Sequence, residues 1–167
     1  FNHRWGAAHD ASVPANTGAA LYPSARYWVE LGICRAAGAE PLLLGYRKIA
    51  RNTDERTIIC TLLPEVAAND AVQLIRTDPP DLNARLLMLG IINSFVLDYA
   101  ARNKVGGTNM SFNYVRQFPV PRPQDVPTEA RTAIIEATSN LLARDEEMAQ
   151  LLGRPRVEDL DVAATRA

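Results

Sequence analysis

The richest local chemistry of the sequence lies in a polar cluster that begins at Arg47-Lys48 and continues through the hexamer Arg51–Arg56, RNTDER. A second polar stretch follows at residues 102–113. Arginine, asparagine and glutamate side chains read base edges in the major groove of DNA, and lysine neutralises phosphates. The two stretches therefore indicate contact with DNA. The candidate contacts are Arg47, Lys48, Arg51, Asn52, Arg56, Arg102, Lys104 and Asn109.

These candidates divide by the chemistry of their side chains. The arginines and lysines are expected to bind mostly phosphate, whereas Asn52 and Asn109 can each pair bidentately with an adenine. The alternative interpretation is that both stretches are solvated loops with internal ion pairs. Arg51–Arg56 contains two acids and two arginines, which can satisfy one another. The alternatives differ in whether Arg51 and Arg56 point outward or toward Asp54, Glu55 and Asp98.

The segment Asp78-Pro79-Pro80-Asp81 is similar to the loop with which amino-methyltransferases hold an extruded base. In that loop an aromatic residue follows the prolines and stacks on the base, but here the fourth residue is aspartate. No glycine-rich stretch for S-adenosylmethionine precedes it. We therefore interpret the segment as the start of a helix that Asp81 caps, and we expect no methyl transfer from this chain alone.

Other catalytic chemistry finds little support in the sequence. The chain has two lysines, Lys48 and Lys104, and neither lies in an acidic-x-Lys nuclease element. His3 and His9 lack cysteine or carboxylate partners at metal-ligand spacing, so no metal site is predicted.

The two cysteines, Cys34 and Cys60, are too few for a disulfide framework and are expected to be free core residues in a reducing compartment. No apolar run approaches the roughly 20 residues needed to span a bilayer, and no signal peptide is seen. We therefore expect a cytoplasmic protein with no membrane partner. The opening FNHRWG is typical of the interior of a longer chain, which suggests a fragment.

Charge separates the two parts of the chain. Residues 1–122 contain 13 basic and 10 acidic residues, whereas residues 123–167 contain 5 basic and 9 acidic ones. Any nucleic-acid contact should therefore lie in the first part. We accordingly divide the chain into a recognition-like domain, residues 1–122, and a trailing part, residues 123–167, with a proline linker, a helix and a loose tail.

The elements that must position the polar stretches follow from hydrophobic periodicity. Residues 1–25 are expected to be loops and short extended pieces. One helix should run from the Asp81 cap to Asn103, with Gly106 as its stop, and a second from Thr128 to Leu152, with Gly153 after it. Strands are predicted at residues 26–29, 41–49, 57–63, 71–75 and, as an edge strand before the prolines, 111–120.

These elements predict a mixed α+β fold. A small, partly antiparallel sheet is packed by the first long helix, and a proline linker leads to a long C-terminal helix. The hexamer Arg51–Arg56 then lies in the turn between two strands.

Three segments carry a resemblance to a known family: FNHRW, RNTDERTIICTLLP and INSFVLDYAARNKVGGTNMSFNYVRQFPVPRP. Together they resemble the C-terminal target-recognition region of N6-adenine-specific DNA methyltransferases, which occur in restriction–modification and phage-exclusion systems. The resemblance covers roughly Phe1 to Leu152. It implies an upstream catalytic domain of the same polypeptide that binds S-adenosylmethionine, and it places Arg51–Arg56 and Lys104–Asn113 near double-stranded DNA or the domain junction.

The resemblance assigns no cofactor and no catalytic residue to this chain. Two other classes stay open beside DNA recognition. The chain can be a structural scaffold that braces a methyltransferase or nuclease domain without direct DNA readout, or part of an enzyme whose nuclease lies elsewhere.

Overall fold

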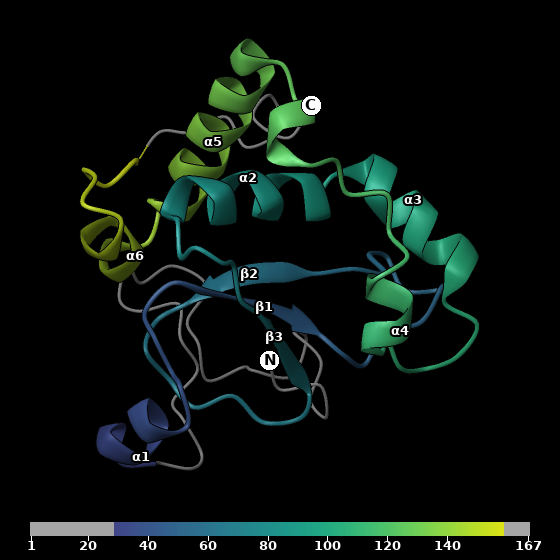
Figure 1. The fold of residues 1–167 in the computed structure, drawn as a ribbon, viewed down its shortest axis with the longest axis horizontal. Helices are drawn as coiled ribbons and strands as arrows, with labels where there is room; N and C mark the ends of the chain where they lie inside the picture. The colour runs from purple at the N-terminus through teal and green to yellow at the C-terminus, as the bar shows by residue number, and fades with distance from the viewer. Residues whose placement is uncertain (1–28, 159–167) are drawn as a thin grey trace.

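The computed structural model describes residues 29–158, in which a small antiparallel sheet is packed by helices (Figure 1). The strands are β1 (Leu43–Arg47), β2 (Cys60–Leu63) and β3 (Val72–Ile75). β1 lies between the other two and pairs antiparallel with both. The predicted α+β class is confirmed, and all three strands lie within predicted ranges.

The residues of β1 alternate between the two faces of the sheet. Leu44 and Tyr46 are fully buried in the main hydrophobic core. Gly45 points the other way, and a Cβ atom there would lie 2.6 Å from Leu63 Cδ1 and 3.0 Å from Val72 Cγ1. The side chains of Leu63 and Val72 therefore occupy the space that a side chain at residue 45 would need.

The first core helix, α2, spans Leu82–Ile92 and begins where the sequence predicted. The carboxylate of Asp81 accepts hydrogen bonds from the backbone N–H groups of Asn83, at 3.2 Å, and Ala84, at 2.9 Å. These bonds satisfy donors that the first turn leaves unpaired. The segment Asp78–Asp81 therefore leads into a capped helix.

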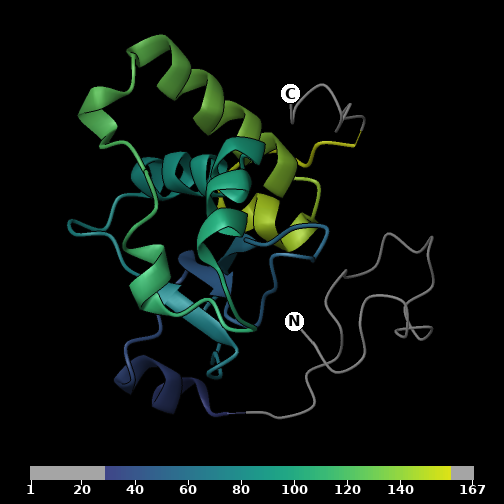
Figure 2. The ribbon, with the colours of Figure 1, turned by 90° about the vertical axis from the view of Figure 1, so that its right-hand side faces the viewer.

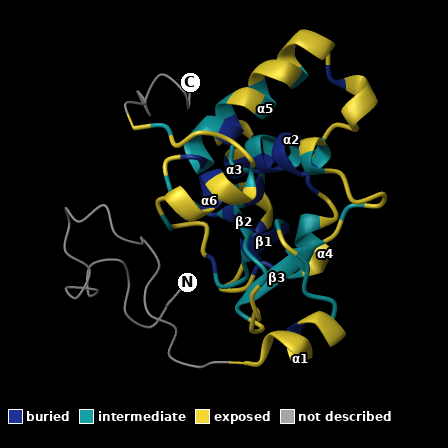
Figure 3. Ribbon diagram, turned by 90° about the vertical axis from the view of Figure 1, so that its left-hand side faces the viewer, coloured by how far each residue is buried: buried dark blue, intermediate teal, exposed yellow. Residues whose placement is uncertain are grey.

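Helix α2 lies between the sheet and α5 (Thr128–Leu142), as Figures 1 and 3 show. α5 comes so close at Gly90 that a Cβ atom there would lie 2.6 Å from both Ile134 Cγ2 and Thr138 Oγ1. The fold is thus layered as sheet, α2 and α5, and α2 is the buried middle layer.

The prediction of one helix from residue 82 to residue 103 is wrong. α2 ends at Ile92, and a separate helix, α3 (Phe95–Lys104), leaves at 65°. The side chain of Ser94 accepts a hydrogen bond from Leu97 N at 3.2 Å and caps the new helix. The apolar periodicity continues through this break, so the sequence pattern concealed it.

The predicted edge strand at 111–120 is also wrong. Its first part is a short helix, α4 (Phe112–Val115), in which Tyr114 N donates to Ser111 O at 3.0 Å. Phe112 packs edge-on against Tyr46, with ring centroids 6.2 Å apart. The alternating pattern of 111–120 is thus also compatible with a short helix, in which Phe112 contacts the core residue Tyr46.

The C-terminal helix is divided as well, which corrects the predicted single helix from residue 128 to residue 152. A proline-led 3-10 turn, Pro123–Asp125, precedes α5, and α6 (Glu146–Leu151) follows it. Asp145 begins α6 by accepting from Met148 N at 3.0 Å. Met148 lies in the same core as the sheet, whereas the boundary predicted at residue 123 stays a prediction.

Helix α1 (Leu31–Ala36) falls where no element was predicted, and it lies away from the layers, at the bottom of Figure 2. Arg35 Nε pairs with Glu65 at 2.6 Å and connects α1 to the segment after β2. The predicted loops at 1–25, most of the predicted strand at 26–29 and most of the predicted tail lie outside the described residues.

Within residues 29–158, no helix alone has the length and apolar character to cross a membrane. The bent pair α2 and α3 meets those criteria together, by length and composition only.

Candidate nucleic-acid interface

The loop Arg51–Arg56 connects β1 to β2 and is closed by Asp54. Asp54 Oδ2 accepts from Arg51 N at 3.1 Å and from Arg47 Nη2 at 3.0 Å. The second bond ties the loop to the end of β1. Arg47 Nη2 also donates to Arg56 O at 2.8 Å, so Arg47 holds the loop together from inside.

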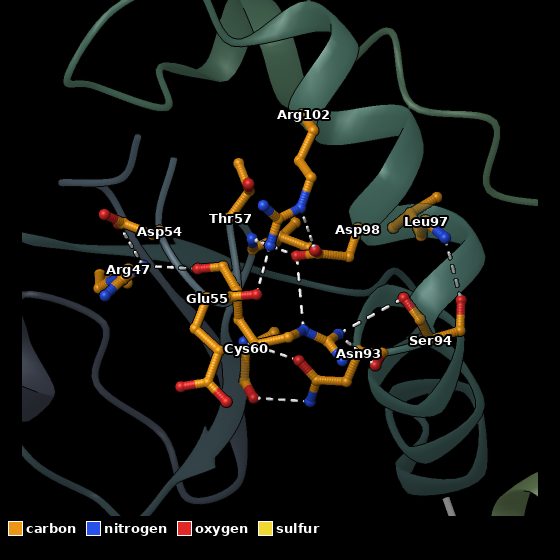
Figure 4. A network of polar contacts seen from close by, with 12 residues as sticks. Arg47, Asp54, Glu55, Thr57, Cys60, Asn93, Ser94, Leu97, Asp98 and Arg102 are labelled. Atoms are coloured by element: carbon orange, nitrogen blue, oxygen red, sulfur yellow. Dashed lines mark hydrogen bonds and ion pairs between the residues drawn. The ribbon is translucent and has the colours of Figure 1, made fainter. Parts of the chain in front are cut away.

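The centre of the site is the buried carboxylate of Asp98 on α3, shown in Figure 4. Asp98 Oδ1 accepts from Ile58 N at 3.0 Å and lies 3.5 Å from Arg56 Nε. Asp98 Oδ2 accepts from Arg102 Nε at 2.9 Å. A buried charge is tolerated only when it is paired and hydrogen-bonded, as it is here.

The charge state of Asp98 follows from these contacts. Burial alone would raise its pKa, because a low dielectric disfavours the ionised acid. The hydrogen bond from Ile58 N and the guanidinium groups of Arg102 and Arg56 outweigh burial and hold the pKa of Asp98 below its ordinary value. Asp98 is therefore a carboxylate at neutral pH, and it attracts both arginines.

Arg102 joins α3 to the loop. Its Nη1 donates to Asn52 O at 3.1 Å, and its Nη2 donates to Glu55 O. Because Nε binds Asp98, all three nitrogens of the guanidinium group have acceptors within the chain. Arg102 thereby fixes the backbone of the loop (Figure 4).

Arg56 fixes the junction of α2 and α3 in a similar way. Its Nη2 donates to Asn93 O at 2.6 Å, and its guanidinium group lies 4.8 Å from the centroid of the Phe95 ring. Asn93 in turn pairs its side chain with β2, accepting from Cys60 N at 3.0 Å and donating to Cys60 O at 2.8 Å. This amide satisfies backbone groups on β2 as another strand would.

The second polar segment lies against the first. Met110 N donates to Lys48 O at 2.6 Å, and Ala50 N donates to Thr108 O at 3.1 Å. Ile49 and Asn109 form an isolated antiparallel bridge between these bonds. Residues 48–50 and 108–110 thus run side by side, and Arg102 binds the loop that follows residue 50. Two stretches far apart in the sequence therefore form one surface.

The eight predicted residues fall into two groups on this surface. Three of the arginines bind the protein itself as described above, and Lys48 Nζ pairs with Asp70 at 2.5 Å. The other four residues are exposed, and their side chains form no hydrogen bond or ion pair with other residues in the range 29–158. The exposed group, which we call the rim, consists of Arg51, Asn52, Lys104 and Asn109.

Two exposed residues of the loop, Thr53 and Glu55, were not among the candidates, and Glu55 is the charged one. The carboxylate of Glu55 has no hydrogen bond or ion pair among the described residues. The carboxylate of its neighbour Asp54, by contrast, accepts two hydrogen bonds. A glutamate carboxylate can accept a hydrogen bond from the N4 amino group of cytosine. Its position in the hexamer was the available signal, since it adjoins the candidate Arg56.

Cys60 has no nucleophilic role in this site. It is buried in the core, and burial raises the pKa of its thiol to about 12. A thiol that stays protonated at neutral pH is a poor nucleophile. Cys60 therefore contributes packing and the backbone groups that Asn93 binds.

No family model matches the chain, and neither a curated protein nor a solved structure matches it. The functional argument therefore depends on the residues and their geometry.

Proposed function

We propose that the chain is the DNA-recognition portion of a larger adenine-specific DNA methyltransferase of the restriction–modification kind. In this proposal an upstream domain of the same polypeptide binds S-adenosylmethionine and methylates adenine at N6. The chain holds double-stranded DNA in register for that domain. The observation that carries the proposal is the meeting of residues 51–56 and 104–109 on one face, with the rim residues exposed.

The geometry supports recognition because the loop is held before any ligand arrives. Asp54, Arg47 and Arg102 fix the backbone on either side of Asn52. A held loop loses little conformational entropy on binding. In the proposed complex Arg51 and Lys104 bind phosphates, and Asn52 and Asn109 pair with adenine edges.

Binding should be weak and salt-sensitive, since the rim carries two cations beside the free carboxylate of Glu55. Non-specific complexes commonly have dissociation constants of about 10⁻⁴–10⁻⁶ M at physiological salt. The test is fluorescence anisotropy of the 167-residue chain with a labelled duplex over a range of salt concentrations. We expect affinity in that range at physiological salt, rising as salt is lowered.

The variants Arg51→Ala and Lys104→Ala should each reduce the slope of log affinity against log salt by about 1, because each loses one phosphate contact. Arg144→Ala is the matched control, since it removes an exposed cation near the break between α5 and α6. Absence of binding even at low salt would contradict the proposal.

A second candidate function is a scaffold that braces a methyltransferase or nuclease domain without reading DNA. The observation that favours it is the inward direction of Arg56 and Arg102, which both pair with Asp98. The salt titration separates the two functions, because a scaffold binds no duplex and is indifferent to Arg51→Ala.

The proposal assigns catalysis to the upstream domain. The purified chain should therefore transfer no labelled methyl group from S-adenosylmethionine to DNA. Turnover above background would contradict this assignment and reopen the interpretation of Asp78–Asp81. We further propose a cytoplasmic location, where DNA is accessible and the free, buried Cys34 and Cys60 stay reduced.

A further inference from the structure

Large apolar side chains gather on the outward face of α3. Phe95, Val96 and Tyr99 are 65%, 80% and 71% exposed, although the same helix buries Leu97 and Ala101. Positions 95, 96 and 99 are neighbours on a helical surface, so the three side chains form one patch. Two aromatic rings exposed side by side are unusual on a surface that binds nothing.

The surroundings of this patch are cationic. The Arg56 guanidinium group lies over the Phe95 ring, and the exposed Lys104 ends the helix. The single carboxylate of α3, on Asp98, is buried toward the sheet and already paired. The outward face of α3 therefore combines aromatic rings with positive charge and carries no exposed acid.

The helix that carries the patch also reaches the rim. The rim residue Lys104 is the last residue of α3, and Arg102 binds the loop carbonyls of Asn52 and Glu55 from the same helix. A ligand held by the rim would thus adjoin α3. Aromatic rings beside a cationic surface are the means by which proteins bind unpaired nucleic-acid bases, because every base offers a face for stacking.

We propose that Phe95 and Tyr99 form a stacking surface for an unpaired base of the DNA that the rim holds. The inference depends on the proposed function, since the rim must bring the DNA to α3. It adds a separate ligand chemistry: the rim binds paired DNA through phosphates and base edges, whereas α3 binds the face of a base that has left the stack.

The test compares two labelled probes, a fully paired duplex and the same duplex with a central bulge of unpaired adenines. The wild-type chain should prefer the bulged duplex. The double variant Phe95→Ala/Tyr99→Ala should bind the bulged duplex about tenfold more weakly, as expected when base stacking is lost. Its affinity for the paired duplex should change by less than about twofold, because the rim is intact.

Two further variants keep the test interpretable. Tyr99→Ala alone retains the contact between Arg56 and Phe95. If this variant loses the preference for the bulged duplex, the loss therefore cannot be due to the absence of that contact. Ile33→Ala is the matched control, since it shortens an exposed apolar side chain on α1, at the opposite end of the molecule (Figure 1). It should leave the affinity for both probes unchanged.

The possible failures are distinguishable. Equal affinity of the wild type for both probes, or a preference that survives in the double variant, overturns the stacking surface and leaves the proposed function intact. Failure to bind either probe overturns both. Self-association of the wild type in sedimentation that Phe95→Ala/Tyr99→Ala abolishes, without a change in bulge preference, identifies α3 as a protein contact and overturns the inference.

Discussion

Two pairs of cations with the same charge behave differently in this molecule. Arg56 and Arg102 point into the protein and share the buried carboxylate of Asp98. Arg51 and Lys104 lie within a few residues of them in sequence, yet are exposed and unpaired within the described chain. Arg56 and Arg102 hold the loop and the junction of α2 and α3 in place. Arg51 and Lys104 lie on the surface that these segments form.

The difference shows what decides the role of a cation in a polar loop. Each group carries two positive charges, so the deciding factor is a carboxylate within reach that is buried away from solvent. Asp98 is such a carboxylate, because it is buried and has few other donors. The inward cations should therefore affect stability, and the outward ones should affect binding.

The largest effect on stability is expected from Asp98→Ala. It leaves Arg56 and Arg102 without their carboxylate and Ile58 N without an acceptor. Breaking a buried, hydrogen-bonded pair costs about 3–5 kcal/mol. The free energy of unfolding in urea measures this loss. Glu55→Ala removes an exposed acid nearby as a control and should change stability by less than about 0.5 kcal/mol.

Lowering the pH should weaken the contacts of Asp98 with Arg56 and Arg102, because it protonates the Asp98 carboxylate. The pKa of Asp98 is lower in the folded protein than its usual value of about 3.9 in an unfolded chain. Its stabilising contribution is therefore complete above that unfolded value and is lost as pH falls toward the folded pKa. Melting temperatures of the wild type should decline on acidification below about pH 4. The decline should be shallower for Asp98→Asn, and equal declines would contradict the role of Asp98.

A smaller effect is expected from Asp54→Ala, which opens the loop without disturbing the Asp98 contacts. The lost bond to Arg47 is only partly buried and the one to Arg51 N is exposed, so the stability should fall by about 1 kcal/mol. Duplex affinity should fall as well, because the rim is no longer held in place. Thr53→Ala changes an exposed neighbour and should alter neither unfolding in urea nor anisotropy.

Much of the fold was predictable because its strands carry strong local signals. The β-branched and apolar runs at 41–49, 57–63 and 71–75 each contain a strand. The break between α2 and α3 was not predictable from periodicity, because Ile92, Val96 and Tyr99 keep helical spacing across it. Val96 and Tyr99 turn out to be exposed, so this apolar stripe does not mark a single buried face.

The site was predictable in its location but not in the direction of its side chains. The sequence identified both polar stretches, and it raised Asp98 as a possible partner of Arg56. It could not show that Asn93 would pair with β2, because that contact depends on the 65° turn between two helices. Side-chain direction here is set by tertiary contacts between residues about forty positions apart.

The most direct test of the account compares Arg51→Ala with Arg56→Ala in the same chain, measuring melting temperature and duplex affinity for each. Arg51→Ala should melt like the wild type and bind DNA more weakly. Arg56→Ala should lose about 2 kcal/mol of stability, since it removes charged hydrogen bonds, while its folded fraction binds the paired duplex normally. A destabilised Arg51→Ala protein with normal affinity, or an unchanged melting temperature in Arg56→Ala, would contradict the division into bracing and binding cations.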